Sequence, residues 1–153
     1  MDKLTVALLS GGRSAEREVS LKSGEQVYQA LNKEKYHIRR YDPRDDLPRL
    51  MAEAEEIDVA LIILHGRYGE DGTIQGLLEL FDIPYHGSGV LGSAIGINKI
   101  QSKRLYEYAG LPVAPYLILD RSDPDAQSKV RNALGVGGGG EPDQEGAGGG
   151  RGR

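Results

Sequence analysis

An apolar run followed at once by a glycine-rich polar loop is the feature that most constrains the fold of this chain. Residues 59–64 read Val-Ala-Leu-Ile-Ile-Leu, and residues 65–72 read His-Gly-Arg-Tyr-Gly-Glu-Asp-Gly. An apolar run of this length without polar alternation predicts a strand buried on both faces of a parallel sheet. Because ligands bind beyond the carboxyl ends of such strands, the loop that begins with His65 is a candidate site.

The polar loop leads into a predicted helix that begins at Thr73, where apolar residues recur at helical spacing. Free N–H groups at a helix N-terminus favour anions, which is one interpretation of the loop. The other is that Asp71 only caps the helix while the glycines serve the turn. The sequence leaves both open for Asp71, whereas His65 at a strand tip favours a functional role.

The beginning of the chain repeats the order of strand, glycine turn and helix. Residues 4–9 are apolar, Gly11 and Gly12 follow, and an apolar stripe at helical spacing runs through residues 19–31. A glycine turn at this point cradles phosphate in dinucleotide-binding folds. Here the spacing is not GxGxxG, and no acidic residue follows the second strand at the matching distance. The turn alone is therefore a weak signal for a nucleotide.

Charged residues stand between this turn and its helix. Glu16 lies where a helix dipole keeps a carboxylate ionised, which suits it to hold an ammonium group. For Arg17 and Glu18 we expect solvated charges that cap the helix. If the strands lie in one parallel sheet, Glu16 and His65 should line one concave face at its carboxyl edge.

Strands and helices also alternate along the chain from residue 36 to residue 108. Further strands are expected at 36–42 and 84–85, and further helices at 47–55, 92–97 and 99–108. This alternation predicts the α/β class, as a three-layer sandwich with a parallel sheet in the middle.

Composition and charge narrow the class of protein. No apolar run approaches the roughly 20 residues that span a bilayer, and the first residues carry no hydrophobic signal region, so we expect a cytoplasmic protein without a membrane partner. Cysteine is absent and the three histidines lack ligand spacing, which predicts no metal site in this chain. A net charge of −4 and a pI near 5.4 argue against nucleic acid as a partner.

Three segments together resemble the N-terminal part of D-alanine:D-alanine ligases. They are residues 11–20 (GGRSAEREVS), residues 65–76 (HGxxGEDGxxQG) and residues 84–89 (PYxGSG). Their order and spacing match the family, and the resemblance extends over about residues 4–119. Two positions depart from the family pattern: His86 stands where a small residue such as Thr is usual, and Asn98 where Asp is usual.

The resemblance implies a Rossmann-like pre-ATP-grasp domain over residues 1–120, which binds substrate, and a linker helix over residues 121–134 that begins the ATP-grasp domain. It implies a ligase that joins two D-alanines with ATP and magnesium for peptidoglycan synthesis. The implied roles are ammonium binding for Glu16, a position beside the reacting carboxylate for His65, and contact with the nucleotide phosphates for Lys99. Val19 is implied to contact substrate.

The end of the chain breaks the pattern, because 10 of the residues 135–153 are glycine. Such a segment buries too little surface to offset its conformational entropy, so we expect a disordered tail. Pro142, Glu145 and Gly146 keep the spacing of the first strand of the family's ATP-binding domain, with Glu141 in place of its lysine. The tail therefore resembles a corrupted copy of that strand.

These features predict a fragment of the ligase that binds neither ATP nor magnesium tightly and is inactive by itself. One alternative is a non-catalytic module of Rossmann or flavodoxin type that binds a nucleotide or another anion at Gly11 and Gly12. Another is a remnant that only associates into a homodimer through exposed apolar surface.

Overall fold

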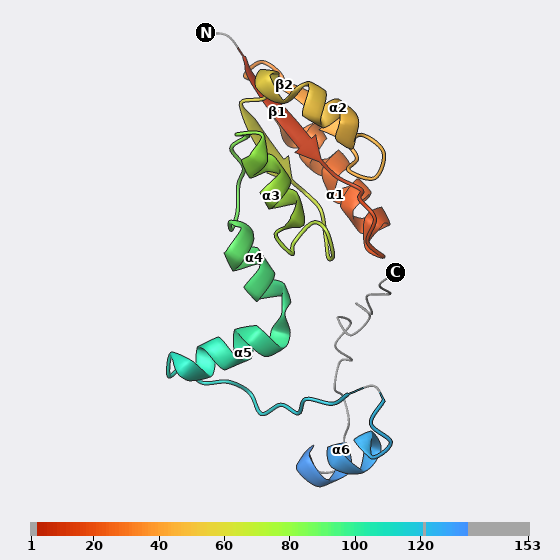
Figure 1. The fold of residues 1–153 in the computed structure, drawn as a ribbon. Helices are drawn as coiled ribbons and strands as arrows, with labels where there is room; N and C mark the ends of the chain where they lie inside the picture. The colour runs from red at the N-terminus through yellow and green to blue at the C-terminus, as the bar shows by residue number, and fades with distance from the viewer. Residues whose placement is uncertain (1–2, 121, 135–153) are drawn as a thin grey trace, which may run out of the picture. The chain divides into compact units, whose positions relative to one another are not determined.

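The computed structural model describes residues 3–120 and 122–134, and these divide into two compact units with the boundary between Ile97 and Asn98. The first unit holds a parallel sheet and the helices that cover it (Figure 1). Within its described residues, the second holds two helices. The tail predicted over residues 135–153 lies outside the described residues.

The sheet confirms the predicted parallel α/β fold. Its strands are β1 (Leu4–Leu9), β2 (Tyr36–Tyr41) and β3 (Val59–Ile62), in the order β2-β1-β3. Both pairings are parallel, with Leu4 opposite Tyr36 and Val6 opposite Val59. The first and third strands are therefore neighbours, and their carboxyl ends lie side by side.

The strand buried most completely is β1 and not β3, so the expectation of two buried faces for residues 59–64 was wrong. Residues 6–9 of β1 are almost fully buried, whereas in β3 only Ala60 is. The reason is topological, because β1 lies between two strands. On its outer side β3 meets only an isolated bridge from Ala60 to Tyr85, which is all that forms of the predicted strand at 84–85.

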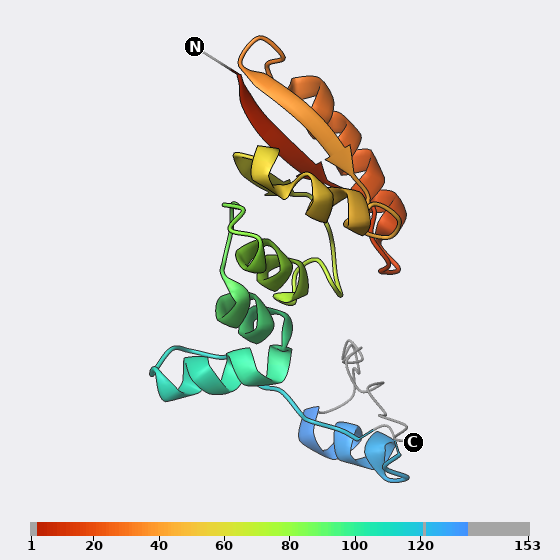
Figure 2. The same ribbon diagram turned by 45° about the horizontal axis from the view of Figure 1, so that its top comes forward.

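Helices lie on both faces of the sheet, as Figures 1 and 2 show. The elements of the first unit are α1 (Arg17–Ala30), α2 (Leu47–Ala52), the short 3-10 helix η1 (Ala54–Glu56), α3 (Thr73–Leu80) and α4 (Val90–Ile97). The chain moves from β1 to β2 in one direction along the sheet and returns past β1 to β3 in the other. Because both crossovers are right-handed, the helices that they contain lie on opposite faces of the sheet. The predicted helix at 47–55 is divided at Glu53 into α2 and η1.

The main core forms where α2, η1 and α3 cover one face of the sheet. Its buried members are Ala7, Leu9, Tyr41, Leu50, Ala54, Ile57, Ala60, Leu64, Ile74, Leu78 and Ile83. On the other face α1 approaches so closely that a Cβ added to Gly24 would collide with the side chain of Ser10. This tight contact fixes the middle of α1 against the residue that follows β1.

The second unit contains α5 (Lys99–Tyr108), with the predicted bounds, and α6 (Ala126–Leu134). Asn98 caps α5, because its side-chain Oδ1 accepts a hydrogen bond of 3.0 Å from the N–H of Gln101. The amide oxygen of Asn98 thus caps the helix as the carboxylate of an aspartate would. None of the helices within the described ranges is long and apolar enough to cross a membrane.

Candidate functional site

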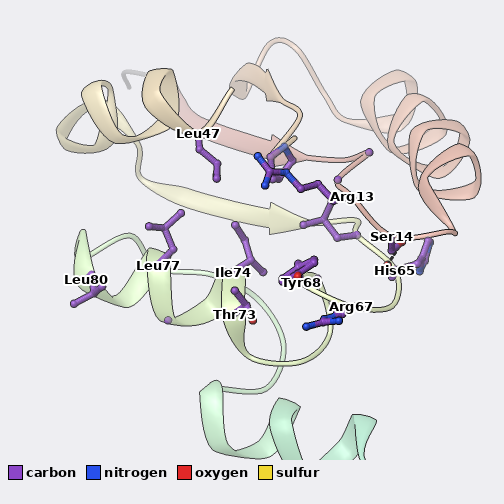
Figure 3. A pocket seen from close by; sticks show the side chains of 16 residues that line it. Arg13, Ser14, Leu47, His65, Arg67, Tyr68, Thr73, Ile74, Leu77 and Leu80 are labelled. Carbon is purple, nitrogen blue, oxygen red and sulfur yellow. Dashed lines mark hydrogen bonds between the residues drawn. The ribbon is translucent and has the colours of Figure 1, made fainter. Parts of the chain in front are cut away.

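Two loops meet at the carboxyl edge of the sheet, one between β1 and α1 and one between β3 and α3. Ser14 in the first loop donates a hydrogen bond of 2.7 Å to the carbonyl oxygen of His65 in the second. The same hydroxyl accepts a hydrogen bond of 3.1 Å from the N–H of Glu16. Figure 3 shows Ser14 and His65 next to each other. One side chain therefore ties the backbones of Glu16 and His65 together.

The Glu16 carboxylate lies against Gly66, the residue after His65. An added Cβ on Gly66 would overlap Glu16 Oε2, and the backbone of Gly66 has a φ of +68°. The positive φ favours glycine at this position, and the overlap shows how close the Glu16 carboxylate lies to the Gly66 backbone. Glu16 itself is exposed and His65 is half-buried, so the carboxylate is open to a ligand beside the histidine.

The loop from His65 to Gly72 is held by its own carboxylates. Glu70 accepts a hydrogen bond of 2.6 Å from the N–H of Gly66. Asp71 accepts from the N–H groups of Tyr68 (2.8 Å) and Thr73 (3.0 Å). Partial burial raises the pKa of Asp71, but these donors outweigh it and hold that pKa below its usual value. Asp71 therefore orders the loop and accepts from the first N–H of α3, although the N-cap residue of that helix is Gly72.

Tyr68 has a left-handed backbone, with a φ of +68°, which is uncommon for a residue other than glycine. Its ring is partly exposed, and the Arg67 guanidinium lies 4.9 Å from the ring centroid. Behind the loop, the buried Gln75 donates a hydrogen bond of 3.0 Å from Nε2 to the carbonyl oxygen of Gly69. Strain of this kind concentrates at functional loops and persists only where neighbouring contacts fix it.

The glycine turn after β1 is closed by internal hydrogen bonds. The N–H of Gly11 donates to Ser20 Oγ and the N–H of Gly12 donates to Asp42 Oδ1, both at 2.8 Å. Ser20 Oγ in turn donates to the carbonyl oxygen of Ile63. Neither glycine N–H is available to a phosphate, and the Asp42 carboxylate stands beside the turn.

Arg17 is not the solvated charge that the sequence led us to expect. Its Nη1 forms an ion pair of 2.5 Å with Asp42 Oδ2, and its side chain is only 24% exposed. Burial raises the pKa of Asp42, but hydrogen bonds from the N–H groups of Gly12 and Arg44 and the Arg17 guanidinium lower it below the usual value overall. The partner lies 25 residues away, so only the fold reveals the pair. Glu18 is exposed, as expected.

A cavity of about 530 Å³ opens beside these loops (Figure 3). Its apolar lining comes mainly from Leu47, Leu64, Ile74, Leu77 and Leu80, and its polar rim includes Arg13, Ser14, His65, Arg67 and Tyr68. His65 lines this cavity but the exposed Glu16 does not, so the expectation that both residues would line one concave face was wrong for this cavity.

The other two predicted site residues occupy different elements. Val19 lies in the first turn of α1, one turn after Glu16, and is 58% exposed. Lys99 is the exposed first residue of α5 and belongs to the second unit. Among residues 3–120 and 122–134 there is no group of three or more His, Asp or Glu side chains placed to hold a metal ion.

Comparison with known proteins gives a family match over the part of the chain that carries these loops. The family described as D-ala D-ala ligase N-terminus matches residues 5–44 and 39–88. The D-alanine--D-alanine ligase of Syntrophobacter fumaroxidans is 69% identical over 135 residues, which are 88% of this chain and 43% of that protein. The enzyme of Desulfotalea psychrophila is 53% identical over 122 residues, 80% of this chain and 38% of that protein. The chain thus spans less than half the length of these relatives.

Solved structures agree in fold. The D-alanine--D-alanine ligase of Bacillus anthracis superimposes with a TM-score of 0.72 at 35% identity, over 84% of this chain and 42% of that one. The same enzyme complexed with ATP gives a TM-score of 0.71 at 36% identity, over 83% of this chain and 44% of that one. The family match includes both loops that meet at Ser14, and it covers more than half of the sequence. The chain therefore belongs to the D-alanine--D-alanine ligase family, as an N-terminal part of it.

Proposed function

We propose that this chain is the N-terminal substrate domain, over residues 1–120, of a ligase that joins two D-alanines for peptidoglycan synthesis. In this proposal the Glu16 carboxylate binds the ammonium group of the first D-alanine, and Val19 contacts the same substrate. His65 donates a hydrogen bond to the charge that develops on the reacting carboxylate. The linkage of Glu16 and His65 through Ser14 is the observation that supports this most directly.

The linkage matters because the two ends of one amino acid have opposite charges and a fixed separation. A carboxylate suits the ammonium end, and an imidazole suits the carboxylate end. The Ser14 side chain bonds to the backbones of both residues, so the separation of the two backbones is set before substrate binds. Preorganisation of this kind lowers the cost of orienting a small substrate.

For the nucleotide we infer that Lys99 provides a positive charge for the phosphates of ATP. A relative was solved as a complex with ATP. ATP, with magnesium, supplies the phosphoryl group that activates the first carboxylate for attack by the second amine. We further propose that the segment 121–134, in which α6 lies, leads into the nucleotide domain of the whole enzyme. A cytoplasmic location follows from the use of ATP.

The alternative of a nucleotide-binding module at Gly11 and Gly12 is disfavoured by the closed turn. Both N–H groups are already donated within the chain, and the nearest carboxylate, that of Asp42, would repel a pyrophosphate. Titration with NAD, FMN and ATP is expected to show no binding tighter than about millimolar. Micromolar binding of a dinucleotide would support this alternative instead.

A chimera tests the proposed function. Residues 1–120 of this chain would replace the equivalent segment of the Syntrophobacter fumaroxidans ligase, and formation of D-alanyl-D-alanine would be measured. We expect an active chimera, since that relative is 69% identical over the matched region. Glu16→Gln in the chimera should lower kcat/KM for D-alanine by about 10- to 100-fold, because it removes a charged hydrogen bond worth roughly 1.5–3 kcal/mol.

The control is Glu18→Gln, which removes an equally exposed carboxylate from the same helical turn. It should leave kcat/KM within about twofold, as expected for a surface charge. Equal losses in the two variants would refute a specific role for Glu16. An active chimera in which His65→Ala has no effect would refute the role of the imidazole.

We also propose that the whole protein forms a homodimer. Leu80 on α3 is 82% exposed and Leu91 on α4 is 74% exposed, although both are large apolar side chains. Exposed apolar surface of this kind favours association. Sedimentation velocity at several concentrations would detect it, and a Leu80→Asp variant that sediments like the unmodified chain would argue against α3 as the contact.

A further inference from the structure

A second cleft, of about 430 Å³, adjoins the apolar cavity at the β1–α1 loop, because Gly12, Arg13 and Ser14 line both. It is lined by Gly12, Arg13, Ser14, Arg17, Arg44 and Asp45. Three arginines therefore line one space at the carboxyl edge of the sheet: Arg13 and Arg44 from two loops, and Arg17 from the first turn of α1. Neither Glu16 nor His65, the two proposed substrate-binding side chains, is among its lining residues, although Ser14, which links their backbones, is.

Positive charge in this cleft exceeds the negative charge that balances it. Arg17 is paired with Asp42 at 2.5 Å, and Arg44 is 3.9 Å from Asp45. Within the described ranges Arg13 makes no ion pair, and its Nη2 donates only a long hydrogen bond of 3.4 Å to the carbonyl oxygen of Arg44. Three arginines against two aspartates leave one net positive charge, in a chain whose overall charge is −4.

We propose that this cleft binds the carboxylate group of a small anionic ligand. Guanidinium presents N–H donors in a planar fork that matches the two oxygens of a carboxylate. A single net positive charge matches a monoanion better than a doubly charged phosphate. The glycine N–H groups that would cradle a phosphate are already bonded to Ser20 and Asp42. Arg13 supplies the uncompensated charge, and Arg44 and Arg17 add further donors.

Titration of the 15N-labelled chain with sodium acetate, at constant ionic strength set by chloride, tests the site. We expect saturable shifts of the backbone N–H signals of Arg13 and Arg44, with a Kd in the millimolar range. Inorganic phosphate, titrated in the same way, distinguishes the two oxyanion types. Binding of phosphate more than about tenfold tighter than acetate would overturn the assignment to a carboxylate.

The double variant Arg13→Ala/Arg44→Ala should weaken acetate binding by at least about tenfold, because it removes charge-assisted hydrogen bonds. Lys22→Ala/Lys35→Ala removes the same charge from exposed positions outside the cleft and should bind like the parent chain. Arg13→Lys/Arg44→Lys keeps the charge but not the fork, and should give an intermediate affinity.

Equal binding by the parent chain and the Arg13→Ala/Arg44→Ala variant would mean an adventitious ion only and would overturn the proposal. So would an absence of saturable shifts. Dispersed amide spectra of each variant would show that it is folded before binding is compared. The outcome does not depend on ligase activity, so this proposal and the ligase proposal can fail separately.

Discussion

Gly24 shows how a single residue sets the distance between a helix and the sheet. An added Cβ would lie well inside van der Waals contact of the Ser10 side chain, which leaves no space for even one methyl group. Gly24→Ala should therefore destabilise the chain by about 1–3 kcal/mol, the usual cost of overpacking. Urea unfolding followed by circular dichroism measures this change in the free energy of unfolding.

Gly96 in α4 is the matched control, because it is also a helical glycine but has open space where its Cβ would stand. Gly96→Ala should be neutral or stabilise by up to about 1 kcal/mol, through the better helix propensity of alanine. Equal destabilisation by both substitutions would show that the close contact of Gly24 with Ser10 is not the cause.

At the scale of residues, the sequence indicates side chains that a motif carries and misses those that act through distant partners. Glu16 and His65 stand in recognisable patterns beside glycines. Ser14 and Asp42 do not, because their partners lie 51 and 30 residues away in the chain. Only the pairing of β1 with both neighbours brings these partners together. A small polar residue between a glycine turn and a helix is the one sequence signal that could have indicated Ser14.

Among the elements, β2 and the α2–η1 segment are joined by a polar contact at the rim of the core. The ring of Tyr41 is 1% exposed, and its hydroxyl donates a hydrogen bond of 2.5 Å to Glu53 Oε2. Arg39 contacts the same carboxylate at 3.2 Å. Burial of the Tyr41 hydroxyl is the main cause, and its hydrogen bond to Glu53 the second, of a rise in the pKa of Tyr41 from 10.0 to about 12.

This contact predicts a pH dependence. Because folding raises the pKa of Tyr41, its contribution to stability is complete below pH 10 and is lost as the pH rises towards about 12. Tyr41→Phe should lower the free energy of unfolding by about 1 kcal/mol at pH 7, the net value of one hydrogen bond. The difference between the parent chain and the variant should shrink in urea unfolding experiments above pH 10.

The control for Tyr41→Phe is Tyr108→Phe, which removes a hydroxyl from a side chain that is 93% exposed. Its free energy of unfolding should match that of the parent chain at every pH. A difference for Tyr41→Phe that stays constant up to pH 12 would mean that the hydroxyl does not titrate in the manner expected.

The elements themselves were largely predictable, and the exceptions have physical reasons. Hydrophobic periodicity placed α5 correctly, because Gly110 ends it and Asn98 caps it. It placed the end of the strand at 59–64 two residues too late. β3 ends at Ile62, and the carbonyl oxygen of the next residue, Ile63, accepts a hydrogen bond from Ser20 Oγ. Periodicity reports which residues are apolar, but a strand ends where its backbone finds another partner.

For the whole molecule, the central expectation is that the 153-residue polypeptide does not ligate D-alanine when it is expressed alone. It spans 43% of the length of the Syntrophobacter relative, and the two glycine N–H groups that could have held a phosphate are already bonded within the chain. Phosphoryl transfer depends on groups that position the γ-phosphate and its metal. Within the described ranges, no cluster of His, Asp or Glu side chains is placed to hold a metal ion.

The assay incubates the chain with ATP, magnesium and D-alanine and measures release of phosphate, with the active chimera as positive control. We expect no release above that of a buffer blank, because in the proposed function Glu16 and His65 hold D-alanine, while a nucleotide domain supplies the phosphoryl group that activates its carboxylate. Turnover by the isolated chain that Glu16→Ala abolishes would contradict this expectation and would mean that the activity resides in these residues alone. Release that Glu16→Ala leaves unchanged would instead indicate a contaminating ATPase, because the open carboxylate of Glu16 is the group proposed to select the amino acid.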